Sequence, residues 1–181
     1  HGHWQKRTLF DNATRVPLIV AGQGINKNEK IMGAPVELVD IYPTLMELLD
    51  MDTPEFVSGK SFAPLLKDSN ARVRESALTE LGVNTGYGAK VSGYSIKTER
   101  YRLTQWGYRG VLGFELYDHK YDKQELNNLA NLDSYKFIKD SLTNVLSYRI
   151  SEAQRKPKGL EIIFDDAREW REPREVFSQP K

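Results

Sequence analysis

The first seven residues of the chain combine side chains that can handle an anion. Two histidines, His1 and His3, stand before the aromatic Trp4, and the cations Lys6 and Arg7 follow at once. A lysine held beside an aromatic ring can supply a point charge to a sulfate or phosphate oxygen. A solvated surface loop often carries the same residues, so composition and spacing alone leave the role of Lys6 open.

Metal and nucleophile chemistry has little support in the residues. His1 and His3 can present two imidazoles on one side of a strand, but no third ligand stands near them, and a tag remnant leaves a similar start. Asp118, Asp122 and Glu125 are spaced like part of a calcium loop, yet the glycine and the closing glutamate of an EF-hand are missing. A turn with solvated carboxylates is predicted there. Only one histidine occurs beyond residue 3, so no Ser-His-Asp arrangement can be assembled.

Two other features favour binding only weakly. Gly22-Gln23-Gly24 follows an apolar run, but it lacks the third glycine of a dinucleotide-binding loop, and polar residues follow where a helix should begin. Trp106 stands at the end of a predicted strand, where it can either stack on a sugar ring or fill a core or rim position.

Composition excludes several classes of partner. The 181 residues carry 26 basic and 25 acidic side chains, and the formal charge of +1 leaves no electrostatic footprint for nucleic acid or an anionic membrane. No apolar run approaches the roughly 20 residues that span a bilayer, and no secretory signal pattern is visible. The absence of cysteine excludes disulfides, thiolate metal sites and cysteine nucleophiles, and it leaves the compartment open.

The elements that must position these residues begin with an α/β pattern. Residues 15–22 form a short, partly β-branched apolar run that is typical of a buried strand. Apolar residues at helical spacing predict a helix over about residues 40–50, with Asp40 as its N-cap. Residues 59–66 predict a docking turn followed by one helical turn.

A glycine-rich break at residues 81–88 separates this part from a β-rich unit. Residues 93–98 and 101–106 alternate apolar and polar side chains and are joined by two residues, which predicts a hairpin, and 114–118 supplies a third strand. An amphipathic pattern over residues 134–150 predicts a helix that covers this small antiparallel sheet.

The pattern divides the chain into three predicted units. Leu126 and Leu129 are predicted to anchor a turn that ends the sheet, and a linker containing Pro157 and Gly159 leads to a charged, extended segment. The units are the end of an α/β core at residues 1–85, a sheet-plus-helix subdomain at 86–152, and a charged extended tail at 153–181.

The chain also resembles a known family. Residues 1–6 and 9–19 are similar to the stretch G-E-H-G-x-W-x-K … R-V-P-L of type I sulfatases, in the iduronate-2-sulfatase-like branch of the alkaline-phosphatase superfamily. Each motif alone is modest, but five in the family's order over about residues 1–130 make the resemblance specific. The further stretches are 36–45, 59–66, 93–98 and 115–129, the last with Lys123 where proline is usual.

The resemblance implies a fold and an activity. The fold is α/β: the C-terminal part of an alkaline-phosphatase-like sulfatase core, followed by a small antiparallel β-sheet subdomain covered by a C-terminal helix. The activity is that of a sulfuric ester hydrolase acting on a sulfated sugar or glycosaminoglycan, in which a hydrated formylglycine attacks sulfur and a calcium ion polarises the sulfate. Only Lys6 maps to a catalytic role, as a ligand of a sulfate oxygen, and the expected substrate-binding residues are His1, Trp4 and Trp106.

The sequence also departs from the family pattern. The motif C/S-x-P-S/A-R, from which formylglycine is made, does not occur, and neither do the paired aspartates and the Asp-His pair that hold calcium. The chain is therefore expected to contribute no metal ligand and to be inactive alone. It would need a missing N-terminal sulfatase segment as a partner, with a sulfated carbohydrate as the substrate. A periplasmic, secreted or lysosome-like location is implied by the resemblance only.

Two other functions stay open. A phosphodiesterase or phosphonate hydrolase of the same superfamily would share the scaffold, although such enzymes tend to carry two metals, and the Trp-x-Lys spacing of the first motif favours the sulfatase. A non-catalytic module of the β-rich unit would instead bind a sulfated glycan through Arg100, Arg102, Trp106 and Arg109.

Overall fold

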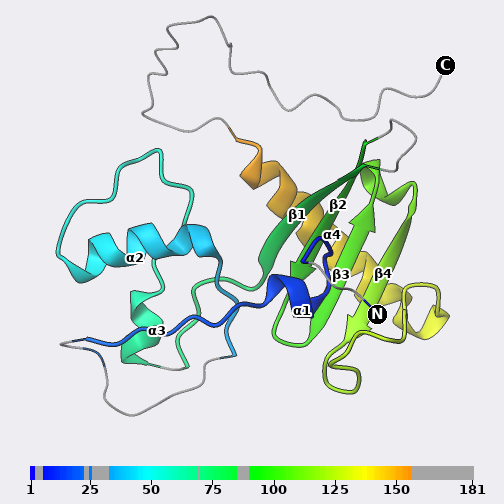
Figure 1. Cartoon of the computed structure of the whole chain (residues 1–181), viewed down its shortest axis with the longest axis horizontal. Helices are drawn as coiled ribbons and strands as arrows, with labels where there is room; N and C mark the ends of the chain where they lie inside the picture. Colours follow the sequence, from blue (N-terminus) through cyan, green and yellow to red (C-terminus); the bar gives the residue numbers. More distant parts are fainter. Residues whose placement is uncertain (3–5, 23–24, 26–32, 69, 85–89, 156–181) are drawn as a thin grey trace, which may run out of the picture.

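The described part of the chain is built around one sheet with a different cover on each face. The computed structural model describes residues 1–2, 6–22, 25, 33–68, 70–84 and 90–155. Four antiparallel strands pair in the order β1-β2-β3-β4. Figure 1 shows helix α4 behind this sheet, the short helix α1 in front of it, and helices α2 and α3 to one side. The strands are β1 (Ala77–Asn84), β2 (Lys90–Lys97), β3 (Tyr101–Trp106) and β4 (Gly113–Asp118), and the helices are α1 (Asp11–Thr14), α2 (Ile41–Leu48), α3 (Ala63–Lys67) and α4 (Lys136–Ala153).

Helix α4 covers the apolar face of the sheet. The register pairs Ile96 with Leu103 and Leu103 with Leu116, which places the three side chains in one row across β2, β3 and β4. All three are fully buried, and so is Leu146 of α4, which packs against them. The predicted hairpin, the third strand and the covering helix are therefore confirmed.

The opposite face of the sheet is polar, and it is nevertheless buried. Ser95, Arg102 and Thr104 are each at most 2% exposed. They lie on the face opposite Leu103, because side chains alternate between the two faces along a strand. The N-terminal segment around α1 covers this face (Figure 1). The sheet thus separates an apolar core from a polar one.

Sequence reasoning placed the start of the sheet too late. Residues 81–84 were expected in a glycine-rich break, but they belong to β1, whose Leu81 pairs with Gly93 and whose Val83 pairs with Val91. Residues 85–89, the rest of that predicted break, lie outside the described residues. Gly82 hides the alternation of β1 in the sequence, because a glycine inside a strand pattern predicts a break.

The predicted buried strand within residues 15–22 does not form. Val16, Leu18 and Ile19 are exposed instead, Ile19 to 88%. A strand needs a neighbouring strand to pair its N–H and C=O groups, and the described sheet, β1 to β4, leaves this segment without one. The segment is apolar, as expected, but no strand among the described elements pairs with it.

Helix α2 forms as predicted, although its start is organised differently. Asp40 takes the N-cap position of α2, as predicted, but its side chain makes no capping hydrogen bond there; its backbone is helical, and it also ends the 3₁₀ turn η1 (Leu38–Asp40). Its fully buried carboxylate accepts hydrogen bonds from the backbone N–H of Glu37 and of Lys60, both at 2.8 Å, and from the guanidinium of Arg74. The local pattern before α2 gives no sign of an arginine 34 residues away.

A second ion-pair group ties α2 to the sheet and to α4. Glu37 accepts hydrogen bonds from Arg74 at 2.7 Å, from Arg149 of α4 at 2.6 Å and from the backbone N–H of Leu78 in β1 at 2.7 Å. The predicted helical turn after residue 62 is confirmed as α3, which carries a small apolar cluster of Phe62, Leu65 and Leu66.

Candidate functional site

The N-terminal segment, which carries the predicted anion-handling residues, lies close against the sheet. Leu9 is 2% exposed and contacts the polar face of the sheet beside Trp106. A methyl group built on Gly93 would lie 2.5 Å from the Trp106 ring and 2.7 Å from Leu9 Cδ1. The missing side chain at Gly93 therefore makes room for both residues and lets the segment approach.

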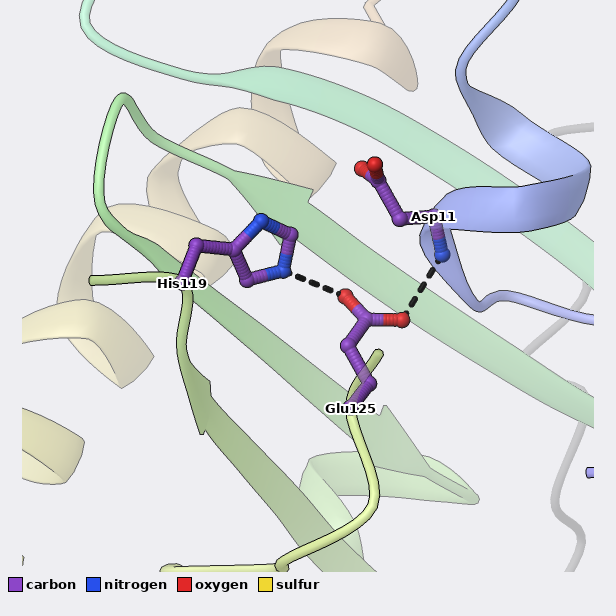
Figure 2. A group of neighbouring side chains, drawn as sticks. All are labelled: Asp11, His119 and Glu125. Atoms are coloured by element: carbon purple, nitrogen blue, oxygen red, sulfur yellow. Dashed lines mark hydrogen bonds and ion pairs between the residues drawn. The ribbon is translucent and has the colours of Figure 1, made fainter. Parts of the chain in front are cut away.

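A buried ion-pair cluster joins α1 to the sheet and to the turn after β4. The cluster consists of Asp11, Arg102, His119 and Glu125, and Figure 2 shows three of these side chains converging. Arg102 Nε donates to Glu125 Oε1 at 2.5 Å, and Arg102 Nη2 donates to Asp11 Oδ1 at 2.8 Å and to Thr14 Oγ1 at 3.0 Å. Glu125 Oε2 accepts the backbone N–H of Asp11 at 2.7 Å. We call this group the Arg102–Glu125 cluster.

Glu125 stays ionised although its side chain is only 1% exposed. Burial by itself raises the pKa of this carboxyl, but the hydrogen bond from His119 Nε2 at 2.6 Å and the charge of Arg102 outweigh burial. The pKa of Glu125 therefore lies below its ordinary range. A charged carboxylate can accept several donors at once, and Glu125 uses this capacity for a side-chain cation, an imidazole and a backbone N–H.

The cluster does not fit a metal ion. Ligand atoms of Asp11, His119 and Glu125 lie within 4.8 Å of one another, a spacing that suits a cation. The guanidinium of Arg102, however, already pairs with both carboxylates, and a divalent ion would be repelled by this buried charge at short range. Arg102 is therefore the cation of this site.

The prediction of solvated carboxylates over residues 118–125 is wrong for two of the three. Asp118 and Glu125 are 1% and 2% exposed. Asp118 accepts from Arg100 Nε at 2.8 Å and from Arg100 Nη2 at 2.6 Å, and this ion pair lowers the pKa of Asp118. The turn is anchored by Leu129, as predicted, but Leu126 is 60% exposed.

Sequence reasoning missed the buried carboxylates because their partners are distant in the chain. The cations come from the β2–β3 hairpin, 18 residues before Asp118 and 23 residues before Glu125. The one local signal was the position of Arg102 in a strand with apolar neighbours, where an unpaired charge would be costly.

The predicted residues of the N-terminal segment lie beside this turn. The imidazole of His1 stacks on the ring of Phe10 with centroids 3.9 Å apart, and His1 Nε2 lies 2.7 Å from the carbonyl oxygen of Gln124. Lys6 is exposed, on the stretch between the His1 and Leu9 contacts. Trp4 lies outside the described residues. A hollow of about 360 Å³ opens here, lined by His1, Phe10, Asp11, Asn12 and residues 123–126.

Trp106 lies on the same face of the sheet as Arg102. Its indole N–H donates to Glu115 Oε1 at 2.9 Å, and its half-buried ring covers Gly93. The glycan-binding alternative depended on Arg102, which is 2% exposed and fully engaged, and on Arg100, which is held by Asp118. Both arginines are thus already ion-paired within the chain, and Trp106 already donates its N–H to Glu115.

Comparison with protein families and with curated proteins gives one result. A family model described as N-sulphoglucosamine sulphohydrolase, C-terminal, matches residues 1–153. The chain is similar to arylsulfatase K of Gallus gallus, with 30% identity over 134 residues that make up 72% of this chain and 25% of that protein. It is also similar to a sulfatase of Formosa agariphila, with 32% identity over 145 residues, 80% of this chain and 26% of that protein. The chain therefore spans about a quarter of the length of these relatives.

Solved structures agree with this result. The chain is similar to a 2-O GAG sulfatase, with a TM-score of 0.64 and 27% identity, covering 74% of this chain and 29% of that one. It is also similar to a protein of Bacteroides thetaiotaomicron described as a sulfatase, with a TM-score of 0.68 and 28% identity, covering 96% of this chain and 36% of that one.

Proposed function

Since the chain belongs to the family of N-sulphoglucosamine sulphohydrolase C-terminal regions, over residues 1–153, we propose that it is part of a sulfuric ester hydrolase that acts on a sulfated sugar or glycosaminoglycan. The predicted fold class is confirmed by the four-stranded antiparallel sheet with its C-terminal helix and by the likeness to solved sulfatases of alkaline-phosphatase-like fold. The observation that carries the proposal is that the family match includes both the Lys6 segment and the sheet face that holds it.

In this proposal Lys6 is the catalytic residue of the chain. Its exposed ammonium group would bind a sulfate oxygen and stabilise the charge that develops as the ester bond breaks. His1, Trp4 and Trp106 would form part of the substrate pocket, and the hollow beside His1 is large enough to admit part of a sugar ring.

The remaining chemistry would come from residues outside this chain. A formylglycine and a calcium ion would supply the nucleophile and the Lewis acid of the complete enzyme. The sequence holds no C/S-x-P-S/A-R motif, and the one described group of three possible ligands is filled by Arg102. We therefore place the calcium ligands in the proposed N-terminal sulfatase segment, and we expect the present chain to be inactive by itself.

Two exposed apolar stretches support a partner of this kind. One is Val16 to Ile19, and the other is formed by Tyr42 and Leu45 of α2 with Leu49, the C-cap of that helix; both are exposed in the described chain. Such surfaces mark sites of association in soluble proteins. We propose that the missing N-terminal sulfatase segment packs on both, so that the part of the chain before β1 completes an α/β core. The appended subdomain, predicted over residues 86–152, then begins with β1 at Ala77, and most of the predicted tail, 153–181, lies outside the described residues.

We propose that the protein is secreted, periplasmic or in a lysosome-like compartment, where an enzyme would encounter sulfated glycans. Among the described residues no helix has the length and apolar character needed to cross a bilayer.

The test is a hydrolysis assay on the native gene product. Its intact mass is measured in the source cells, and the same sample is assayed with 4-nitrophenyl sulfate, with and without a calcium chelator. A product much heavier than a chain of 181 residues that hydrolyses the sulfate, and loses activity with chelator, supports the proposal. Hydrolysis of bis(4-nitrophenyl) phosphate in preference to the sulfate would favour the phosphodiesterase. Absence of both activities would contradict an enzymatic function.

A further inference from the structure

Glu125 is a buried residue with an unusual backbone conformation. Its φ of 57° lies in the left-handed region, which is costly for a residue other than glycine, and its side chain is buried. Strain of this kind persists only where the surroundings fix the residue in place. Here the fixing contacts come from three parts of the chain: β3 through Arg102, the end of β4 through His119, and α1 through Asp11.

The contacts of this turn hold the N-terminal segment on both sides of Lys6. On one side His1 meets the carbonyl oxygen of Gln124, the residue before Glu125. On the other side the backbone N–H of Asp11 donates to Glu125, and the carboxylate of Asp11 accepts from Arg102. The residues His1 and Asp11, which stand on either side of Lys6 in the sequence, are therefore both held by this turn, and Asp11 is also held by β3.

We propose that Glu125 and Arg102 are positioning residues for Lys6, so that the small subdomain sets the geometry of the anion-handling segment. This inference rests on the proposed function. The Coulomb attraction within a buried ion pair only roughly offsets the cost of desolvating its charges, so the pair of Glu125 and Arg102 contributes little net stability. The buried contacts of Leu9 are apolar and not directional, so they would allow several positions of α1. The hydrogen bonds of Glu125 and Arg102 with Asp11 are directional, and they select one of these positions.

The first experiment compares Glu125→Gln with Asp118→Asn in the full-length protein. Glutamine keeps the size of the side chain, but its amide donors oppose those of Arg102 and of the Asp11 N–H. Asp118 is an equally buried carboxylate paired with an arginine, and it contacts Arg100 rather than the N-terminal segment. Hydrogen exchange by mass spectrometry over residues 6–22 should become faster in Glu125→Gln and stay unchanged in Asp118→Asn. Equal exchange in the two variants would overturn the proposal.

The second experiment asks whether Glu125 acts through Lys6. We expect Glu125→Gln to lower kcat/KM for the arylsulfate by about 10- to 100-fold, mainly through kcat, because a small displacement of a charged group weakens its contact with the transition state. In a Lys6→Ala background the same change should cost less than about 3-fold, since the group being positioned is already absent. Independent losses that multiply in the double variant would overturn the proposal.

The outcomes also separate this inference from the proposed function. If the wild-type protein hydrolyses no sulfate ester, the function fails, and hydrogen exchange alone decides whether Glu125 holds the segment. If the wild-type protein is active and Glu125→Gln behaves like Asp118→Asn in kcat, KM and exchange, the positioning role fails and the function stands.

Discussion

At the scale of single residues, the described chain depends on arginines that are buried and paired. Arg102 is 2% exposed, and it satisfies two carboxylates and two hydroxyl groups. Removing one partner of such a group leaves an uncompensated charge in a low-dielectric environment, which is far more costly than the net gain from the intact pair. The loss of stability on mutating one of these residues is therefore set mainly by the buried charge that remains without its partner.

Arg102→Met tests this directly. Methionine fills a similar volume but leaves the buried Glu125 without its arginine and removes the nearer of the two cations that pair with Asp11, so the free energy of unfolding should fall by about 3–5 kcal/mol. The measurement is urea denaturation followed by circular dichroism. Arg72→Met is the control, because Arg72 is 72% exposed and pairs loosely with Glu99 at 3.6 Å; its loss should cost less than about 1 kcal/mol. Similar losses in the two variants would contradict the importance of the buried pair.

At the scale of elements, the sheet is covered on both faces by segments of opposite character. Helix α4 contributes a row of apolar side chains, and the N-terminal segment contributes a short helix and hydrogen-bonding groups. The two faces therefore respond to different substitutions. Apolar truncation weakens the α4 side, whereas added volume disturbs the close approach on the other side.

Gly93→Ala is predicted to disturb the N-terminal segment. Its new methyl group would meet the Trp106 ring at 2.5 Å and Leu9 at 2.7 Å, so one of them must move, and overpacking of this kind costs about 1–3 kcal/mol. Gly82→Ala in β1 is the matched control, because nothing lies within 4 Å of the position that its new methyl group would take. That change should leave the stability unchanged or raise it by up to about 1 kcal/mol. Thermal unfolding of both variants gives the comparison.

Leu146→Ala is predicted to weaken the packing of α4 on the sheet. Leu146 is fully buried against Ile96, Leu103 and Leu116, so truncation leaves a cavity and should cost about 2–5 kcal/mol. Phe137 on the same helix is 85% exposed, and Phe137→Ala should change the stability by less than about 0.5 kcal/mol. Chemical denaturation distinguishes the two. A loss below about 1 kcal/mol for Leu146→Ala would show that α4 does not pack as described.

The sequence predicted elements whose signal is local. The hairpin of β2 and β3 and the helix α4 follow from periodicity, which depends only on which face of an element is buried. The prediction of a buried strand over residues 15–22 is wrong because the same apolar composition suits either a strand or an exposed surface. The Arg102–Glu125 cluster could not be predicted, because its members lie 6 to 114 residues apart and no periodicity links them.

At the scale of the whole molecule, two clusters of charged side chains connect distant parts of the chain. The Arg102–Glu125 cluster joins α1 to the sheet, and Glu37 joins the region before α2 to β1 and α4 through Arg74, Arg149 and the Leu78 N–H. These connections are ionic, and Leu9 beside Trp106 adds an apolar one, while the sheet with α4 and the region around α3 each have their own apolar core. Conditions that change ionisation should loosen the units from one another before either core is lost.

Acid is therefore predicted to destabilise the chain. The Arg100 ion pair lowers the pKa of Asp118, and the net effect of His119 and Arg102 against burial lowers that of Glu125. A group whose pKa is lower in the folded state binds fewer protons there, so its contribution is complete above the ordinary carboxyl pKa, near 4. That contribution should be lost as the pH falls below about 4 and through the folded-state values.

The measurement is the free energy of unfolding in urea at several pH values from about 7 down to about 3. The double variant Glu125→Gln, Asp118→Asn serves as the control, because it lacks both titrating groups. Its stability should fall less steeply below about pH 4 than that of the unchanged chain. Parallel curves would show that other carboxylates control the acid response.

The separation of 114 positions between Asp11 and Glu125 has a consequence for the time course of synthesis. At about 5–20 residues per second, Asp11 is made roughly 6–23 s before the residue that accepts its N–H. During this interval the N-terminal segment has neither Glu125 nor Arg102 to hold it. The segment around Asp11 is thus translated early but is among the last parts of the chain to dock on the sheet. The segment that carries Lys6 takes its final position only when the ribosome has passed the turn after β4.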